Sequence, residues 1–549
     1  MINKVSQSNI NINNSAKDKN KHFAKGQQPA SKTSFNGGID SLIWASQQCE
    51  KNPMVNVSVL DLTSAILPRT FFETVMGSKT KDEDGNTERK LNIHGGFEAF
   101  RRESSGLIVN CLLPSFIVMG ATKALEKPIM GGYNKSSLVN TWANDDSLDK
   151  IQQFYSKAEG KGEEKIYNTF KSMFNSIEGV DGDAEKGGLK NFKDFYDEDI
   201  DTALRKMAKA SIEDKPKDVS EAYQTIVKKT KIAENIKFNG DKGFFSNNLE
   251  ALFKDGAKVL HGVEKEGISN ADELGKYISK AKKLVRGKSI LGMGIIIPLA
   301  ISMQPINRWI THKLSGQKGA PIYNDDKQRK LSDEEKSELN KKKMLAVPLM
   351  AGVAALSMLM DKPSLKMFQF KGLFPTMDQA RIISTATFAS RLASSEDANE
   401  LKENTVRDIA TFSSFYFLGD YVAKGVASLI EKNDPSVKLI NRRKSSKEDA
   451  NIAQKFWNWA KHSSMKSTDE LTSIKDKRLR SLCQLSNLTF SLFSLGMAIP
   501  AYTRHKTQQK EKEKLAKLNL EETSNIKQQK FTSPESIASL SLMNDFLQG

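Results

Sequence analysis

One pair of charged residues lies inside an otherwise apolar segment of this chain, and it is the strongest candidate for chemistry. Asp420 and Lys424 are four residues apart within the segment 409–430. On a helix this spacing places both side chains on one face, in the acid-then-base order that favours pairing. Charges at membrane depth are costly and normally face a bundle interior or a water-filled path. The pair therefore predicts an intramembrane polar site, either an ion path or a structural clamp.

Other residues that could carry chemistry lack the spacing that the chemistry requires. The run from Arg286 to Ser289 ends like a phosphate-binding loop, but Lys282 stands where that motif needs glycine. The acidic run 194–201 lacks the glycine and glutamate of a calcium loop, so it favours a helix start. The six histidines and three cysteines form no metal-ligand or catalytic spacing. We therefore expect no metal and no cofactor, and nothing in the sequence supports an enzyme.

The elements that must position the charged pair are long segments without charge. A helix needs about 20 mostly apolar residues to cross the hydrocarbon core of a membrane. Four charge-free segments have this length, and 409–430 is a fifth whose only charges are the pair. The four segments are 104–122, 289–307, 344–360 and 481–503. We expect four or five spans, because 104–122 either crosses or is re-entrant; the alternative is a set of core helices in a soluble protein.

Basic and aromatic residues stand beside these segments, as expected at a membrane interface. Trp309 follows the segment 289–307, and a basic triplet precedes two tryptophans in the region 431–480. Such residues favour anionic headgroups and the interfacial layer. The lipid-interface candidates are Trp309, Arg442, Arg443, Lys444, Trp457 and Trp459. The alternative for 431–480 is a solvated basic loop with two core tryptophans.

The rest of the chain divides into polar regions. Residues 1–36 have too few apolar side chains to form a core and predict a disordered tail. Apolar periodicity predicts short helices over 37–103 and a polar helical domain outside the membrane over 137–286. Residues 289–503 form the membrane region. A charged helix and an amphipathic segment follow over 504–549, where a protein partner could dock or the segment could pack on its own chain.

The composition is basic and polar on average. The 549 residues include 83 Lys and Arg against 66 Asp and Glu, with a net charge of +17 and a mean hydropathy of −0.49. Only 16 of the cations are arginine, whose planar fork suits phosphates and base edges. We therefore expect no nucleic-acid partner. The predicted spans are a small part of the chain, so the average hydropathy conceals them.

These patterns together predict an all-α, multi-pass membrane protein whose main partner is the lipid bilayer, including anionic lipids. In a bacterial cell it would lie in the cytoplasmic membrane. Three functions fit: a non-enzymatic membrane scaffold or organising protein, a transporter or channel-like protein that uses Asp420 and Lys424, and a helical membrane-associating effector. The scaffold is preferred, because the polar regions are large and the apolar segments have few charges.

Overall fold

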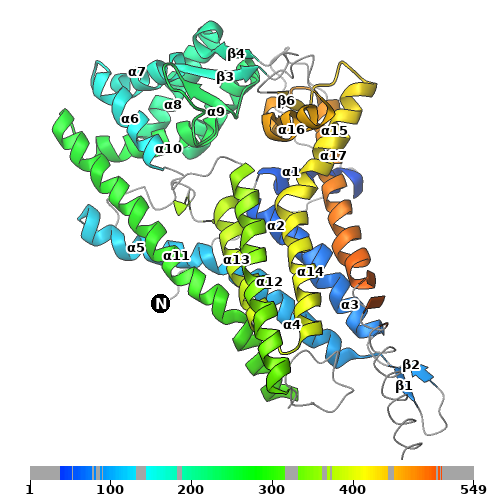
Figure 1. Ribbon diagram of the computed structural model, residues 1–549. Coiled ribbons are helices and arrows are strands. Elements are labelled where there is room, and N and C mark those ends of the chain that lie inside the picture. Colours follow the sequence, from blue (N-terminus) through cyan, green and yellow to red (C-terminus); the bar gives the residue numbers. More distant parts are fainter. Residues whose placement is uncertain are drawn as a thin grey trace, which may run out of the picture. The chain divides into compact units, whose positions relative to one another are not determined.

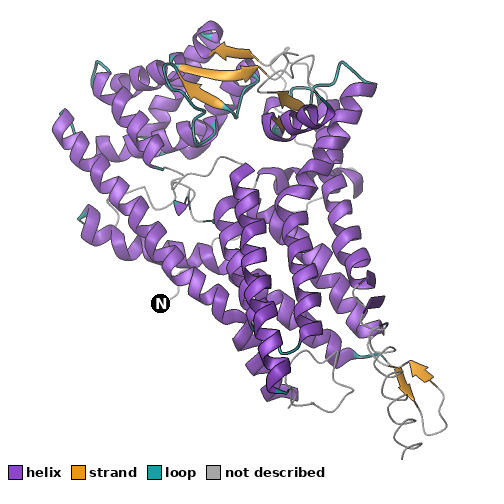
Figure 2. Ribbon diagram, in the orientation of Figure 1, coloured by secondary structure: helices purple, strands orange, loops and turns teal. Residues whose placement is uncertain are grey.

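The computed structural model describes most of the chain between residues 38 and 509. The described residues are 38–51, 53–76, 79–81, 87–89, 91–131, 144–181, 188–315, 332–360, 368–370, 372, 374–442, 451–502, 505, 506 and 509. They are predominantly helical, as predicted, with three small antiparallel sheets that the sequence did not predict (Figures 1 and 2). The predicted disordered tail, 1–36, and almost all of the predicted segment 504–549 lie outside the described residues.

The N-terminal part of the described chain contains short helices and one hairpin. The helices are α1 (Gly38–Lys51), α2 (Pro53–Leu60), the π-helical turn η1 (Asp61–Ile66) and α3 (Leu67–Met76). The hairpin pairs β1 (Lys79–Lys81) with β2 (Thr87–Arg89). Since α2, η1 and α3 follow one another without a break, they form one longer helix with a π-helical turn in the middle.

Residues 144–285 form a polar module around one apolar core. Its helices are α6 (Asp145–Lys157), α7 (Gly162–Asn175), η4 (Phe192–Phe195), α8 (Glu198–Ile212), α9 (Pro216–Thr230), α10 (Leu249–Lys265) and the start of α11 (Ala271–Ser315). Aliphatic side chains make up most of the core, and the rings of Phe170, Phe174, Phe192 and Phe253 lie among them, all fully buried. Burial of these rings gives the module a core of its own, because each removes a large apolar area from water.

A three-stranded sheet completes the polar module. Its strands are β3 (Ile177–Asp181), β4 (Gly188–Asn191) and β5 (Ile236–Phe238), in the order β4-β3-β5. Gly179 lies in the central strand, where an added Cβ would come within 2.5 Å of Ile232 Cγ2. The strands are short and β4 is largely exposed, so no alternation of apolar residues marked them in the sequence.

Side-chain caps begin helices α6, α8 and α10 of the polar module. Asn144, Asp197 and Asn248 each accept a hydrogen bond from the backbone N–H three residues later, at 3.0, 3.1 and 2.8 Å. These bonds satisfy N–H groups that the helix itself leaves unpaired. Asp197 is followed by three acidic residues in the first turn of α8, where the helix dipole favours negative charge. The acidic run 194–201 therefore contains a helix start.

Three helices in the described part are long and apolar enough to cross a membrane. They are Ile93–Met130, with α4 (Ile93–Leu107), η2 (Ile108–Leu112) and α5 (Leu113–Met130); Ala271–Leu314, in α11; and Ile474–Tyr502, with α17 (Ile474–Phe493) and η9 (Ser494–Ala498). They contain the predicted spans 104–122 and 289–307 and nearly all of 481–503. Each of these three predicted spans thus lies in a helix whose length and composition would allow it to cross a membrane.

The two other predicted spans are helical but are not among these three. The segment 344–360 ends α12 (Asp333–Met360), and 409–430 runs through α14 (Ala398–Ser413), η7 (Ser414–Leu418) and α15 (Gly419–Asn433). A further helix, α13 (Met377–Ala393), packs on α11 and α12 although no apolar segment predicted it. The remaining elements are β6 (Ile440–Arg442), α16 (Ile452–His462), β7 (Ser463–Met465) and η8 (Thr468–Glu470).

Small residues let α15 approach α17 closely. Gly419, Ala423 and Ala427 recur at four-residue steps along α15, and all three are buried. A Cβ at Gly419 would come within 2.0 Å of Asn487 Oδ1 on α17 and within 2.9 Å of the Ser414 carbonyl oxygen. Backbones separated by so little space leave no room for a larger residue.

We expect Gly419→Ala to lower the free energy of unfolding by about 1–3 kcal/mol, because the added methyl group overpacks this contact. Gly425→Ala, on the same helix, is the matched control, since nothing lies within 4 Å of its added Cβ. That control should leave stability unchanged or raise it by up to about 1 kcal/mol. Thermal unfolding of the two variants in detergent measures both effects, and equal melting temperatures would contradict the packing argument.

Candidate functional site

The helices α2–α5, the later part of α11, α12–α15 and α17, with the π-helical turns between them, are called the helical bundle below. This bundle exposes apolar side chains and buries polar ones. Large exposed side chains occur on several of its helices, including Phe97 (66% exposed), Ile290 (76%) and Met344 (77%). In contrast, Asp408 and Asn487 are almost completely buried. Soluble proteins rarely bury charged groups and rarely expose large apolar patches, whereas a bundle in lipid does both. The distribution of side chains therefore matches an apolar surrounding.

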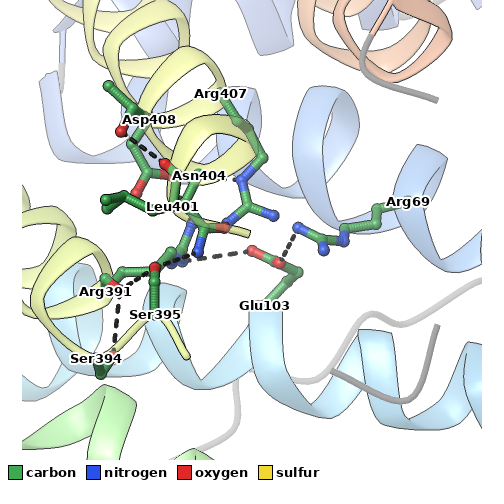
Figure 3. Close-up of polar contacts among 10 residues, drawn as sticks. Arg69, Glu103, Arg391, Ser394, Ser395, Leu401, Asn404, Arg407 and Asp408 are labelled. Atoms are coloured by element: carbon green, nitrogen blue, oxygen red, sulfur yellow. Dashed lines mark hydrogen bonds and ion pairs between the residues drawn. The ribbon is translucent and has the colours of Figure 1, made fainter. Parts of the chain in front are cut away.

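A buried ionic cluster lies between four helices of this bundle (Figure 3). We define it by Arg69 on α3, Glu103 on α4, Arg391 on α13, and Asn404, Arg407 and Asp408 on α14. Its side chains are mostly buried, with 17% of Glu103 and 13% of Arg391 exposed. Because the six residues come from segments up to several hundred positions apart in sequence, only the packing of the helices creates the cluster.

Arg391 connects the two acids of the cluster. Arg391 Nη1 donates to Asp408 Oδ1 at 2.8 Å, and its Nη2 lies 3.9 Å from Glu103 Oε2. Arg69 Nη1 donates to the other Glu103 oxygen at 2.7 Å. Charge-assisted hydrogen bonds of this kind are among the strongest in proteins. The guanidinium of Arg391 thus holds α4 and α14 to α13 through one side chain.

Asp408 is the most deeply buried member of the ionic cluster. Its side chain is 1% exposed, and Oδ1 accepts from both Arg391 and Arg407, the latter at 3.4 Å. Arg407 in turn donates to Asn404 Oδ1 at 2.9 Å. Within the described residues, Asp408 Oδ2 has no hydrogen-bond partner. A buried carboxylate oxygen without a hydrogen bond costs free energy of folding, because its lost hydration is not replaced. Such atoms are uncommon in native proteins and often have a functional role.

Helices of irregular pitch pack beside the ionic cluster. The π-helical turn η1 packs on α4, which carries Glu103, and the π-helical turn η9 packs on α14, which carries Asp408. A π-helical turn interrupts the regular hydrogen-bond ladder and is common at functional sites. The cluster therefore combines buried charge with local irregularity of the backbone.

A second buried polar contact joins α4 to α11. Arg101 donates to Asn307 Oδ1 at 2.9 Å and to Thr311 Oγ1 at 3.0 Å, and Thr311 also bonds to Glu98. On the same stretch of α11, Arg308 pairs with Glu400 on α14. These contacts join two of the three long apolar helices through side chains that are buried in the bundle.

The predicted pair, Asp420 and Lys424, lies on α15. Asp420 is exposed, whereas Lys424 is buried. Lys424 Nζ donates to three backbone carbonyl oxygens at the end of α16, those of Trp459 (3.3 Å), Ala460 (3.1 Å) and Ser463 (3.0 Å). Such carbonyls carry the negative end of the helix dipole, so a cation is favoured there. Lys424 thus fastens the C-terminus of α16 to α15.

The predicted lipid-interface residues occupy different environments. Trp309 is 57% exposed, and Lys313 Nζ lies 4.5 Å from the centre of its ring. Trp457 is also exposed, while Trp459 Nε1 donates to Ser428 Oγ at 3.1 Å. Arg442 pairs with Glu431 at 2.6 Å, and Arg443 and Lys444 lie outside the described residues. Of the three tryptophans among the predicted interface residues, Trp309 and Trp457 therefore present large exposed indole surfaces.

The ionic cluster was missed by the sequence analysis. Its charges lie mostly in α3, α13 and α14, outside the charge-free segments, and in sequence they resemble the polar face of surface helices. The one available signal was arginine within an apolar context, as at Arg391, which follows a run of Thr, Ala, Phe and Ser. The apolar segments alone gave no sign that the bundle buries several charged side chains, among them Asp408, Arg381 and Lys424.

No family model, no curated protein and no solved structure matches the chain. In the part of the chain that the structure describes, no group of three or more His, Cys, Asp or Glu side chains could hold a metal ion. The run from Arg286 to Ser289, which resembled the end of a phosphate-binding loop, lies inside α11.

We expect Arg391→Met to lower the free energy of unfolding by about 3–5 kcal/mol, because it leaves buried carboxylates without their counter-charge. The double variant Arg391→Met with Asp408→Asn should recover part of this loss, since fewer buried charges then lack a partner. Arg205→Met, which removes a half-exposed arginine of the polar module, is the control and should cost no more than about 1 kcal/mol. Denaturant unfolding in detergent compares the three, and a loss at Arg391 no larger than at Arg205 would argue against the cluster.

Proposed function

We propose that this chain is an integral multi-pass membrane protein, in the cytoplasmic membrane if the cell is bacterial. The observation that carries the proposal is the exposure of large apolar side chains along helices whose buried faces hold charged groups. Three of these helices have the length and composition of a span. In this proposal α12 and the segment 409–430 supply the further spans, giving four or five, and the polar module lies outside the membrane.

Within the membrane, the proposed role is that of a non-enzymatic scaffold or organising protein. The support is the way in which charged side chains are used: Arg391, Arg101 and Lys424 each join separate helices through several bonds. Bonds of this kind favour one arrangement of the helices over others. In this role the bundle holds the polar module and α16 in fixed positions, where they can bind partners such as anionic lipids. A further protein partner would bind the segment 504–549.

A second candidate is a transporter or channel-like protein. The observation that favours it is Asp408 Oδ2, which has no hydrogen-bond partner among the described residues and lies deep in a bundle with π-helical turns nearby. Charged residues at such depth mark ion and proton paths in many membrane proteins. In this alternative Asp408 is a stronger candidate than Asp420, which is exposed. A helical effector that only associates with membranes is the third possibility.

Extraction of membranes with alkaline carbonate tests the integral location. We expect the full chain to stay in the pellet after the wash and to be released only by detergent, because apolar helices in the hydrocarbon core are not displaced by loss of ionic contacts. A peripheral protein bound to the same membranes is the control and should be released. Recovery of most of the chain in the carbonate supernatant would contradict the integral location and favour the effector.

Ion flux into proteoliposomes separates the scaffold from the transporter. For a scaffold we expect no flux above protein-free vesicles with K⁺, Na⁺ or H⁺ gradients, and no effect of Asp408→Asn or Asp420→Asn on that background. For a transporter, flux should be present and should fall by at least about tenfold in Asp408→Asn, with Asp420→Asn as the matched exposed control. Flux that depends on Asp408 would replace the scaffold by the second candidate.

A further inference from the structure

Four arginines share one glutamate of the ionic cluster. Glu103 Oε1 accepts from Arg69 Nη1 at 2.7 Å, and Arg391 Nη2 lies 3.9 Å from Oε2, on the other side of the carboxylate (Figure 3). Arg407 and Arg102, the residue before Glu103 on α4, also attract this carboxylate. A single negative charge therefore faces four guanidinium groups, and it cannot neutralise them all.

Arg102 is the member of this group that has no direct partner. Among the described residues, its guanidinium makes no hydrogen bond and no ion pair. The guanidinium groups of Arg69, Arg391 and Arg407 repel it, and Glu103 attracts it from beyond ion-pair distance. The Arg102 side chain is partly exposed, so an anion from outside the bundle can reach it.

The other acids beside the ionic cluster are engaged elsewhere. Asp408 Oδ1 accepts from two other arginines of the cluster. Asp61, on η1, acts on Glu103 and Arg391. Positive charge is therefore in surplus at Arg102, and an anionic ligand would relieve the repulsion between the arginines.

Charged residues at the ends of four predicted spans lie at one level of the bundle. These residues, each within two positions of such an end, are Arg102, Arg308, Lys343 and Asp408. Arg308 pairs with Glu400 on α14, the helix of Asp408, and both act on Lys343. The ionic cluster joins α14 to α4, the helix of Arg102. In the proposed integral location, this level is a boundary of the hydrocarbon core, where lipid headgroups lie.

Apolar side chains are exposed on the same helices. α3, which carries Arg69, packs along α4. Leu67, before Arg69, and Ile108, after Arg102, are both exposed, and Ile108 belongs to the predicted span that follows Arg102. Acyl chains can contact these side chains, whereas a free anion in water gains nothing from them.

We propose that Arg102, with Arg69 as a second cation, binds the phosphodiester group of an anionic membrane lipid beside α3 and α4. The proposal rests on the integral location proposed above, and it names a site at which the scaffold holds anionic lipid. A guanidinium offers a planar fork of N–H donors that fits two phosphate oxygens. Among the described residues, Arg69 uses only Nη1 for Glu103, which leaves the rest of its fork for the phosphate.

Native mass spectrometry of the detergent-solubilised full chain, titrated with dioctanoyl-phosphatidylglycerol, tests the lipid site. We expect saturable binding of one lipid per chain. Dioctanoyl-phosphatidylcholine carries the same phosphate with a choline cation, which the arginines repel, so it should bind about tenfold more weakly or less. Inorganic phosphate distinguishes the source of the ligand: without acyl chains, it should displace the lipid only at a large excess.

Two variants of Arg102 test the residue itself. Arg102→Gln should weaken phosphatidylglycerol binding by about tenfold or more, because charge-assisted hydrogen bonds are lost. Arg102→Glu should remove the binding, and its carboxylate among three arginines favours folding should the glutamine variant be unstable. Arg205→Gln takes one positive charge from the surface of the polar module, so this matched control should bind like the parent chain.

Three results would overturn the proposal: equal binding of phosphatidylcholine, unchanged lipid affinity in both Arg102 variants, or displacement of the lipid by inorganic phosphate at an equal concentration. The last would show a site for free phosphate. Carbonate extraction of the parent chain separates this test from the proposed function. A chain that stays in the pellet but shows any of these results contradicts the lipid site alone, whereas a chain released into the supernatant contradicts the integral location.

Discussion

The need to neutralise two buried carboxylates governs the helical bundle. Glu103 and Asp408 lie on different helices, and Arg391 contacts both. Charges buried in an apolar medium cost several kcal/mol each unless a counter-charge and hydrogen bonds compensate them. The arrangement of α4, α13 and α14 brings the three side chains together, so that each buried carboxylate lies beside an opposite charge.

The same constraint explains the polar side chains nearby. Arg69 supplies a second cation to Glu103, and Asn404 accepts from Arg407, so that most donors and acceptors of the ionic cluster are satisfied within it. Arg101 plays a comparable part between α4 and α11. Interactions of this kind specify the relative position of helices, whereas the apolar side chains on the outer surface, such as Phe97 and Ile290, contact only their surroundings. The buried polar contacts thus act beside the apolar clusters of the bundle, such as that of Leu60, Met350 and Phe412.

The polar module follows the rules of a soluble domain. Helices α6, α8 and α10 begin at side-chain caps, the aromatic residues of its core are buried, and ion pairs such as Lys206 with Glu221 lie at the surface. The Glu470 carboxylate, on η8, accepts from backbone N–H groups of the module and from the side-chain amide of Asn441 on β6. This junction therefore depends on one buried carboxylate, much as the ionic cluster depends on Arg391. The polar module and the long apolar helices therefore differ in composition, and the mean hydropathy of −0.49 is an average over both.

Local sequence pattern by itself determined the helical class, the three long apolar helices and the helix starts, because those depend on residues that are close together in the chain. It did not reveal the short strands, the helix α13 or the ionic cluster. Arg391 and Glu103 are separated by nearly three hundred residues, and each resembles an ordinary surface charge beside its own neighbours. Likewise, Lys424 was expected to act with Asp420, but its Nζ is directed to the carbonyl oxygens that end α16. Only tertiary packing decided which charges became buried and what they contact, because burial and pairing are properties of the space between helices and not of the sequence along one of them.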